Sequence, residues 1–284
     1  MHAELAIGLH RAGDGSVVAR GALAVAPFWC RWDGATLWLV GSAATPVGED
    51  DITIDLQVGE GVSATVRSVA ASVVYAARGE GTRMTTRLHV ASGASLTWQP
   101  EPVIVTARAR HRATIVADVQ TGGALVADEL LVLGRSDESA GGYRSVMDLR
   151  RDGVPLSLSS FDTDTPGWTG PGGTAGAKVV GTRLAVDPSG TADDGRATPV
   201  DGSTVVLRPE AGGAIATTLA QDPDRARAQL DATLPGIQQA AAASLRPGST
   251  SGAARERQVA ASPRQVAVAG AAPAATVGAA LRNC

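Results

Sequence analysis

The sequence is poor in aromatic residues, in lysine and in cysteine. Aromatic residues make up 3% of the 284 residues, so the core must consist mainly of small aliphatic side chains. Lys178 is the only lysine, and the excess of arginine and alanine is typical of a GC-rich coding sequence. The two cysteines, Cys30 and Cys284, are too few and too far apart for a disulfide framework.

Long apolar runs and basic runs are also missing. No stretch approaches the ~18–20 apolar residues of a membrane helix, so we expect no membrane span. The first fifteen residues lack the cationic start and apolar stretch of a signal peptide, which predicts a cytoplasmic protein. A net charge of −3 without a basic cluster argues against nucleic-acid binding.

The motifs of common catalytic sites are absent. The four histidines, at positions 2, 10, 89 and 111, have no partner at the spacing of a metal site. Neither a phosphate-binding glycine loop nor a Gly-x-Ser-x-Gly elbow occurs. We therefore expect a protein that is not an enzyme, and a hydrolase with a scattered triad is the less favoured alternative.

Alternation of apolar and polar residues predicts an all-β protein. Ile52, Ile54, Leu56 and Val58 alternate with polar residues, as in a half-buried strand. Glycine-containing breaks suggest four hairpins of moderate length. Their strands are predicted at 52–58 with 62–69, 84–90 with 95–99, 114–119 with 124–133, and 143–150 with 156–160. Such a succession predicts a meander or a stacked two-layer architecture.

The C-terminal part has a different character. Residues 162–176 are rich in Gly, Pro and Thr and predict a surface loop, with strands resuming at 178–186 and 203–208. Asp222 followed by Pro223 predicts the start of a helix at about 222–243. Residues 246–284 contain few large apolar groups and predict a disordered tail. The expected folded domain is therefore 1–245.

Carboxylates are the side chains best suited to a chemical role here. Asp50 precedes the strand at 52–58, Glu101 lies among prolines, and Glu129 opens a strand. Carboxylate oxygens can pass a divalent cation such as nickel without tight capture. The alternative is structural: a polar turn for Asp50, a solvent-facing Glu101, and an ion pair between Glu129 and Arg108 or Arg110.

Several segments occur in a distinctive order. They are Leu96-Thr97-Trp98-Gln99-Pro100-Glu101-Pro102-Val103, Ala107-Arg108-Ala109-Arg110, Asp128-Glu129 ahead of Gly134-Arg135, Gly48-Glu49-Asp50-Asp51-Ile52 and Ala71-Ser72-Val73-Val74-Tyr75. In this order and spacing the chain resembles the urease accessory protein D family, called UreD or UreH. The family's usual Gly-Glu-Phe is Gly141-Gly142-Tyr143 here, which removes one acid.

The resemblance implies a β-helix-like fold with stacked two-layer sheets and one or two C-terminal helices. It implies a non-catalytic scaffold that binds UreF, and through UreF the GTPase UreG, and conducts nickel into apo-urease. Nickel would be in transit, with no tightly bound cofactor. Asp50 and Glu129 are the candidate acids on that route by position, and Glu101 is a third on chemistry alone.

A second hypothesis from another class remains open. Repeated β-hairpins and five tryptophans would also suit a β-rich structural or carbohydrate-binding module. The absence of an export signal argues against it.

Overall fold

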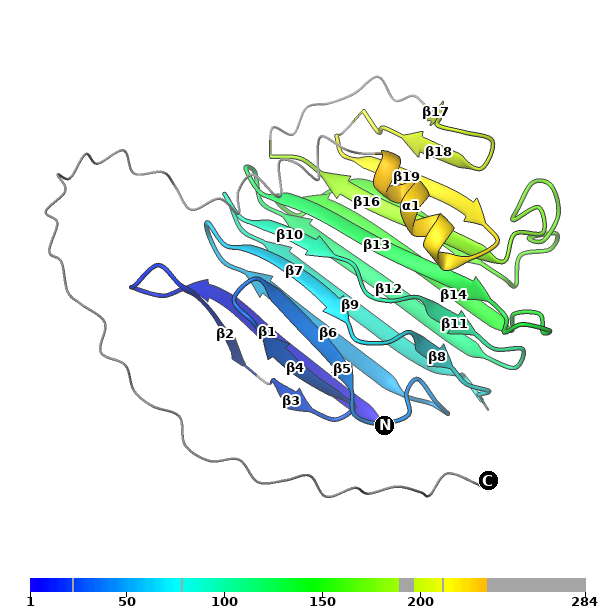
Figure 1. Cartoon of the computed structure of the whole chain (residues 1–284), viewed down its shortest axis with the longest axis horizontal. Coiled ribbons are helices and arrows are strands. Elements are labelled where there is room, and N and C mark those ends of the chain that lie inside the picture. The colour runs from blue at the N-terminus through cyan, green and yellow to red at the C-terminus, as the bar shows by residue number, and fades with distance from the viewer. Residues whose placement is uncertain (22, 78, 189–196, 211, 234–284) are drawn as a thin grey trace, which may run out of the picture. The chain divides into compact units, whose positions relative to one another are not determined.

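The alternating apolar residues form β-strands that assemble into two sheets (Figure 1). This computed structural model describes residues 1–21, 23–77, 79–188, 197–210 and 212–233. Sheet A has seven strands in the order β15-β14-β12-β9-β6-β1-β2. They are β1 (His2–Arg11), β2 (Val17–Gly21), β6 (Asp51–Val58), β9 (Thr82–Val90), β12 (Arg110–Val119), β14 (Gly142–Arg151) and β15 (Val154–Asp162).

Sheet B contains the other twelve strands, and β8 and β11 lie off its main order of β17-β18-β19-β16-β13-β10-β7-β5-β4-β3. They are β3 (Ala24–Val25), β4 (Phe28–Trp32), β5 (Thr36–Gly41), β7 (Ser63–Ser68), β8 (Ser72–Val74), β10 (Ser95–Trp98), β11 (Val103–Val105), β13 (Ala124–Leu133), β16 (Val179–Val186), β17 (Ala197–Pro199), β18 (Thr204–Leu207) and β19 (Ala214–Ala220).

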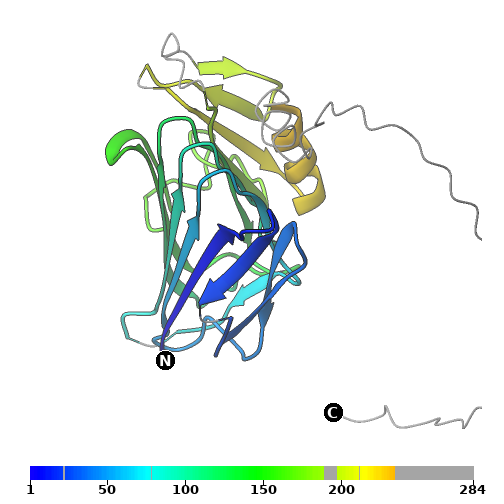
Figure 2. The same ribbon diagram turned by 90° about the vertical axis from the view of Figure 1, so that its left-hand side faces the viewer.

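The chain crosses repeatedly from one sheet to the other. It runs from β6 in sheet A to β7 in sheet B, then returns for β9, and repeats this through β10, β12, β13 and β14. Neighbouring strands from successive turns are parallel in both sheets. Figure 2 shows the two sheets as facing layers. The predicted all-β, β-helix-like, two-layer fold is confirmed.

Three of the four predicted hairpins are wrong. The strands at 52–58 and 62–69, at 84–90 and 95–99, and at 114–119 and 124–133 lie in different sheets and do not pair with each other. Their glycine-containing turns reverse the chain, but they also carry it across to the other layer. The fourth hairpin is confirmed, because β14 and β15 pair antiparallel around Asp152 and Gly153.

Glycine is required where successive turns approach each other closely. Gly81, just before β9, has a positive φ of 82°, which L side chains rarely adopt. A Cβ atom there would lie 2.4 Å from the backbone oxygen of Arg110. The start of one strand in sheet A therefore packs directly on the backbone of the next.

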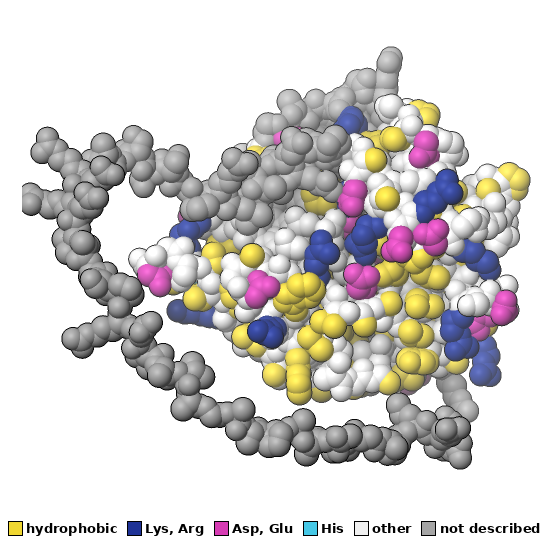
Figure 3. Space-filling view, in the orientation of Figure 1, with side chains coloured by type: hydrophobic (Ala, Val, Ile, Leu, Met, Phe, Trp, Pro, Cys, Tyr) yellow, Lys and Arg dark blue, Asp and Glu magenta, His cyan; other side chains and the backbone are white. Residues whose placement is uncertain are grey.

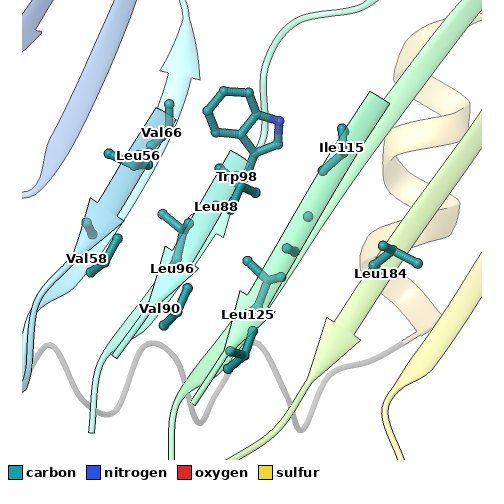
Figure 4. Close-up of a cluster of buried hydrophobic side chains, with 14 of the residues drawn as sticks. Leu56, Val58, Val66, Leu88, Val90, Leu96, Trp98, Ile115, Leu125 and Leu184 are labelled. Atoms are coloured by element: carbon teal, nitrogen blue, oxygen red, sulfur yellow. The ribbon is translucent and has the colours of Figure 1, made fainter. Parts of the chain in front are cut away.

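The main core lies between the two sheets (Figure 4). Leu56, Leu88 and Ile115 from sheet A pack in one cluster with Leu96 and Leu125 from sheet B. Trp98 is 3% exposed and packs in the same cluster. The other tryptophans are less buried, and Trp29 is 61% exposed.

The single helix within the described residues is α1 (Pro223–Thr233). The carboxylate of Asp222 accepts a hydrogen bond from the backbone N–H of Arg225 at 2.8 Å, so the predicted helix start is confirmed. Ala226 and Leu230 pack on sheet B together with Val126 and Leu130 of β13. The remainder of the predicted helix, to 243, and the predicted tail at 246–284 lie outside the described residues.

Candidate functional site

An interruption in sheet B marks the centre of the candidate site. The ladder between β10 and β13 ends at Trp98 and Ala127, and the ladder between β11 and β13 begins at Val103 and Leu131. The prolines between β10 and β11 lack the N–H that a ladder needs. The segment between β10 and β11 is therefore a break within one sheet, and it lies opposite Asp128 and Glu129.

Asp128 and Glu129 point to opposite faces of β13, as successive residues of a strand must. Odd-numbered residues of β13, such as Leu125 and Leu131, pack toward sheet A. Even-numbered residues, such as Val126 and Leu130, pack toward α1. Glu129 thus lies between the two sheets, whereas Asp128 lies under the helix.

Glu129 is a buried acid without a basic partner in the described structure. The hydroxyl of Tyr143, on β14, donates a hydrogen bond to its Oε1 at 3.0 Å. Burial raises the pKa of Glu129, and hydrogen bonds from Ser145 and Tyr143 oppose that change. The alternative of an ion pair with Arg108 or Arg110 is wrong, because the partners are hydroxyl groups.

His111 lies next to Tyr143, near the N-terminal end of β12 in sheet A. Its ring lies 5.4 Å from the ring of Tyr143, centroid to centroid. Its Nδ1 shares a hydrogen bond of 2.6 Å with Oγ1 of Thr82. Burial lowers the pKa of His111 to about 4, so the imidazole is neutral near pH 7. His111 is thus buried and hydrogen-bonded.

A polar hollow of about 290 Å³ opens beside His111 and Tyr143. Its lining also includes Glu80, Arg110, Arg112, Gly142, Arg144, Asp162 and Asp164. A sequence of imidazole, phenol and carboxyl groups therefore leads from this hollow to Glu129. We call Thr82, His111, Tyr143, Ser145 and Glu129 the buried polar chain.

Asp128 forms a second buried centre. Arg183, on β16, is fully buried and donates two hydrogen bonds to the Asp128 carboxylate, at 2.6 and 2.7 Å. Arg183 also donates to the backbone oxygen of Leu230 at 2.8 Å and pairs with Asp231. This network fastens α1 to sheet B.

The other two predicted acids lie elsewhere. Asp50 accepts hydrogen bonds from the Met1 ammonium group at 2.9 Å, from the Thr45 hydroxyl and from the Val47 N–H. Burial alone would raise the pKa of Asp50, but these partners together lower it. Glu101 is 40% exposed and lies 3.7 Å from the guanidinium of Arg227 on α1.

The three acids do not form a common metal site. Within the described ranges, no group of three or more His, Cys, Asp or Glu side chains could hold a metal ion. Glu129 and His111 could each offer a single donor atom to a cation in transit. Asp50 and Glu101 remain predictions as nickel contacts.

Several site residues were missed from the sequence. Tyr143 was noted only as the start of a strand and as the last residue of Gly141-Gly142-Tyr143, and Arg183 was not noted at all. One signal was available for His111: it alternates with Arg110 and Arg112, so it must face away from them and toward the core. No comparable signal marks Arg183, because its partner Asp128 is 55 residues away.

A separate apolar groove is lined by residues of both sheets, among them Ile52 of β6 and Leu39 of β5. It has a volume of about 360 Å³, and its lining includes Val69, Tyr75, Trp98 and Glu101. Val69 is 59% exposed and Tyr75 43%. On the side of the molecule shown in Figure 3, hydrophobic side chains gather next to an area where acidic and basic side chains are intermixed.

The part of the chain that the structure describes has no helix of the length and apolarity needed to cross a bilayer, since α1 has 11 residues.

Comparison with known proteins identifies the family. The family model described as UreD urease accessory protein matches residues 1–248. A protein named urease accessory protein UreD from Parafrankia sp. (strain EAN1pec) is 32% identical over 70% of this chain and 74% of its own length. A protein of the same name from Streptomyces coelicolor is 32% identical over 72% of this chain and 82% of its own length. The relatives are thus named as accessory proteins and not as enzymes. This chain belongs to the UreD family of urease accessory proteins.

Proposed function

We propose that this chain is a scaffold that binds UreF, and through UreF the GTPase UreG, and passes nickel into apo-urease. Family membership supports a role in urease maturation. One observation supports the passage of a cation: the carboxyl group of Glu129 is buried between the sheets. Its partners are hydroxyl groups, and it has no basic partner in the described structure.

The chemistry of the buried polar chain suits weak, transient contacts. Nickel accepts imidazole nitrogen and carboxylate oxygen as ligands. A raised pKa favours the protonated Glu129 when the path is empty. An arriving cation would favour the ionised carboxylate and so oppose the effect of burial on the pKa of Glu129. A single acid supplies too few donors to capture the ion, so the ion can move on.

The test is activation of urease from purified components at limiting nickel. Glu129→Gln keeps the size of the side chain but cannot ionise. We expect it to lower the yield of active urease several-fold, while UreF, UreG and apo-urease still co-purify with the variant. Tyr143→Phe, which removes the hydroxyl partner, is expected to have a smaller effect in the same direction.

Glu4→Gln is the matched control, because Glu4 is an exposed glutamate on β1 that faces away from the core. It should activate urease like the wild type. Wild-type activation by Glu129→Gln would rule out Glu129 as a nickel contact. Failure of that variant to co-purify with its partners would show that Glu129 acts in assembly and not in transport.

A further inference from the structure

Three arginines lie side by side on the outer face of sheet A. Arg83, Arg112 and Arg144 occupy directly paired positions on β9, β12 and β14. Neighbouring strands of a sheet are about 4.8 Å apart. All three side chains are exposed. We call these three residues the arginine row.

Acidic residues close the row at both ends. Asp51, on β6, is paired in register with Arg83, and their charged atoms lie 3.4 Å apart. Asp162, on β15, is paired with Arg144 at 3.8 Å. With these two acids, the order of charged residues across five neighbouring strands is acid, base, base, base, acid. The three arginines and two acids together carry one more positive charge than negative charge.

Arg112, at the centre, has no ion-pair or hydrogen-bond partner for its guanidinium among the described residues. Like charges placed opposite each other on a sheet destabilise it, so the fold gains nothing from Arg112 between Arg83 and Arg144. A negative group contributed from outside the chain would relieve this repulsion. Arg112 and Arg144 also line the hollow of about 290 Å³, so such a group could enter a recess.

We propose that the arginine row is a docking surface for an acidic helix of a partner protein, with a carboxylate seated on Arg112. Residues one turn apart on a helix have Cβ atoms about 5–6 Å apart, close to the spacing between the strands. A helix that crosses the strands can therefore place successive carboxylates along the row. Basic residues at the ends of the acidic stretch would face Asp51 and Asp162.

The acids that surround the row favour a protein partner with both acidic and basic residues over a polyanion such as a nucleic acid. Asp51 and Asp162 close the row, and Glu80 and Asp164 lie at the same hollow. A nucleic-acid backbone would bring phosphate charges against these acids as well as against the arginines. An acidic helix bounded by basic residues avoids that repulsion. The row borders the hollow from which the buried polar chain leads to Glu129, but docking on the row requires no passage of nickel.

The test is fluorescence anisotropy with the full chain at low ionic strength. The probe is a labelled helical peptide that has glutamates one turn apart in its centre and lysines at its ends. We expect saturable binding that weakens as salt is added. Arg112→Gln should weaken binding about fivefold, the loss expected for one exposed ion pair. A peptide with glutamine in place of glutamate should bind no better than background.

Arg87→Gln is the matched control. Arg87 is exposed on β9, the strand that carries Arg83, and on the same face of sheet A, but it is paired in register with Asp55 and lies outside the row. Its replacement should leave the affinity unchanged. Equal affinity of the peptide for wild type, Arg112→Gln and Arg87→Gln would overturn the proposal. So would the absence of saturable binding to the wild type, or tighter Arg112-dependent binding of an oligothymidylate than of the peptide.

Discussion

Glu129 and His111 have opposite pKa changes for the same physical reason. Both are buried between the sheets, and burial penalises whichever form is charged. The pKa of the acid is therefore raised and that of the base is lowered. The imidazole of His111 is therefore neutral near pH 7, whereas for Glu129 burial shifts the equilibrium toward the neutral acid.

His111 should make the protein sensitive to mild acid. Its pKa is about 4 in the folded chain and 6.5 as the reference value, so the unfolded chain binds more protons between these values. The free energy of unfolding should thus fall by up to about 3 kcal/mol as pH decreases from 6.5 to 4. Urea titrations at several pH values would measure this.

His111→Asn is the comparison that isolates the effect, because other groups titrate in the same range. The variant should be less stable than the wild type at pH 7, since Asn fills the site less well. That deficit should shrink as pH falls through the window. A deficit that stays constant from pH 7 to pH 4 would show that His111 is not the group responsible.

At the level of single residues, the sequence indicated which side chains could have a chemical role better than it indicated which groups contact them in the fold. Glu129 was selected as an acid in a family-like segment, but its hydroxyl partners come from β14, on the other sheet. Arg183 pairs with Asp128 across neighbouring strands that are far apart in the chain. Contacts of this kind depend on which layer covers a strand, and local residue patterns do not contain that information.

At the level of elements, the positions of the turns were predicted correctly, but the sheet to which the chain continues after each turn was not. Asp152 and Gly153 have positive φ values of 50° and 77°, which suits a two-residue hairpin turn. The other three breaks are also rich in glycine, yet they lead to the opposite sheet. Glycine shows that the chain bends, and the number and conformation of all the turn residues decide where the next strand goes.

The attachment of α1 gives a prediction at this level. Arg183→Leu would leave the Asp128 carboxylate buried without its charge partner, which costs about 3–5 kcal/mol. Urea denaturation should show that loss. Limited proteolysis should cleave near α1 faster than in the wild type, because Arg183 also binds the Leu230 carbonyl and Asp231.

A double variant serves as the control for that experiment. Asp128→Asn combined with Arg183→Leu removes both charges, so it should recover part of the lost stability. If the double variant were as unstable as the sum of the two single variants, the ion pair would not be the source of the effect.

For the whole molecule, the order of strands predicts a gradient of stability. Each turn contacts mainly the turns before and after it, as in solenoid proteins. Amide hydrogen exchange should be slowest in the central strands β9, β10, β12 and β13. It should be faster toward β2 and β3 at one end and β17 and β18 at the other. Mass spectrometry of exchanged peptides would check this, and greater protection of β2 than of β12 would contradict it.

The regular crossing between sheets also has a consequence for how the protein is made. In sheet A, after the first hairpin, β6, β9, β12, β14 and β15 are added in the order in which they occur in the chain, and sheet B grows in the same direction through β19. Each of these strands thus finds a neighbour already in place as it leaves the ribosome, whereas β17 and β18 join the sheet only once β19 is made. These strands can therefore fold in sequence during translation, before the C-terminal end of the chain is made.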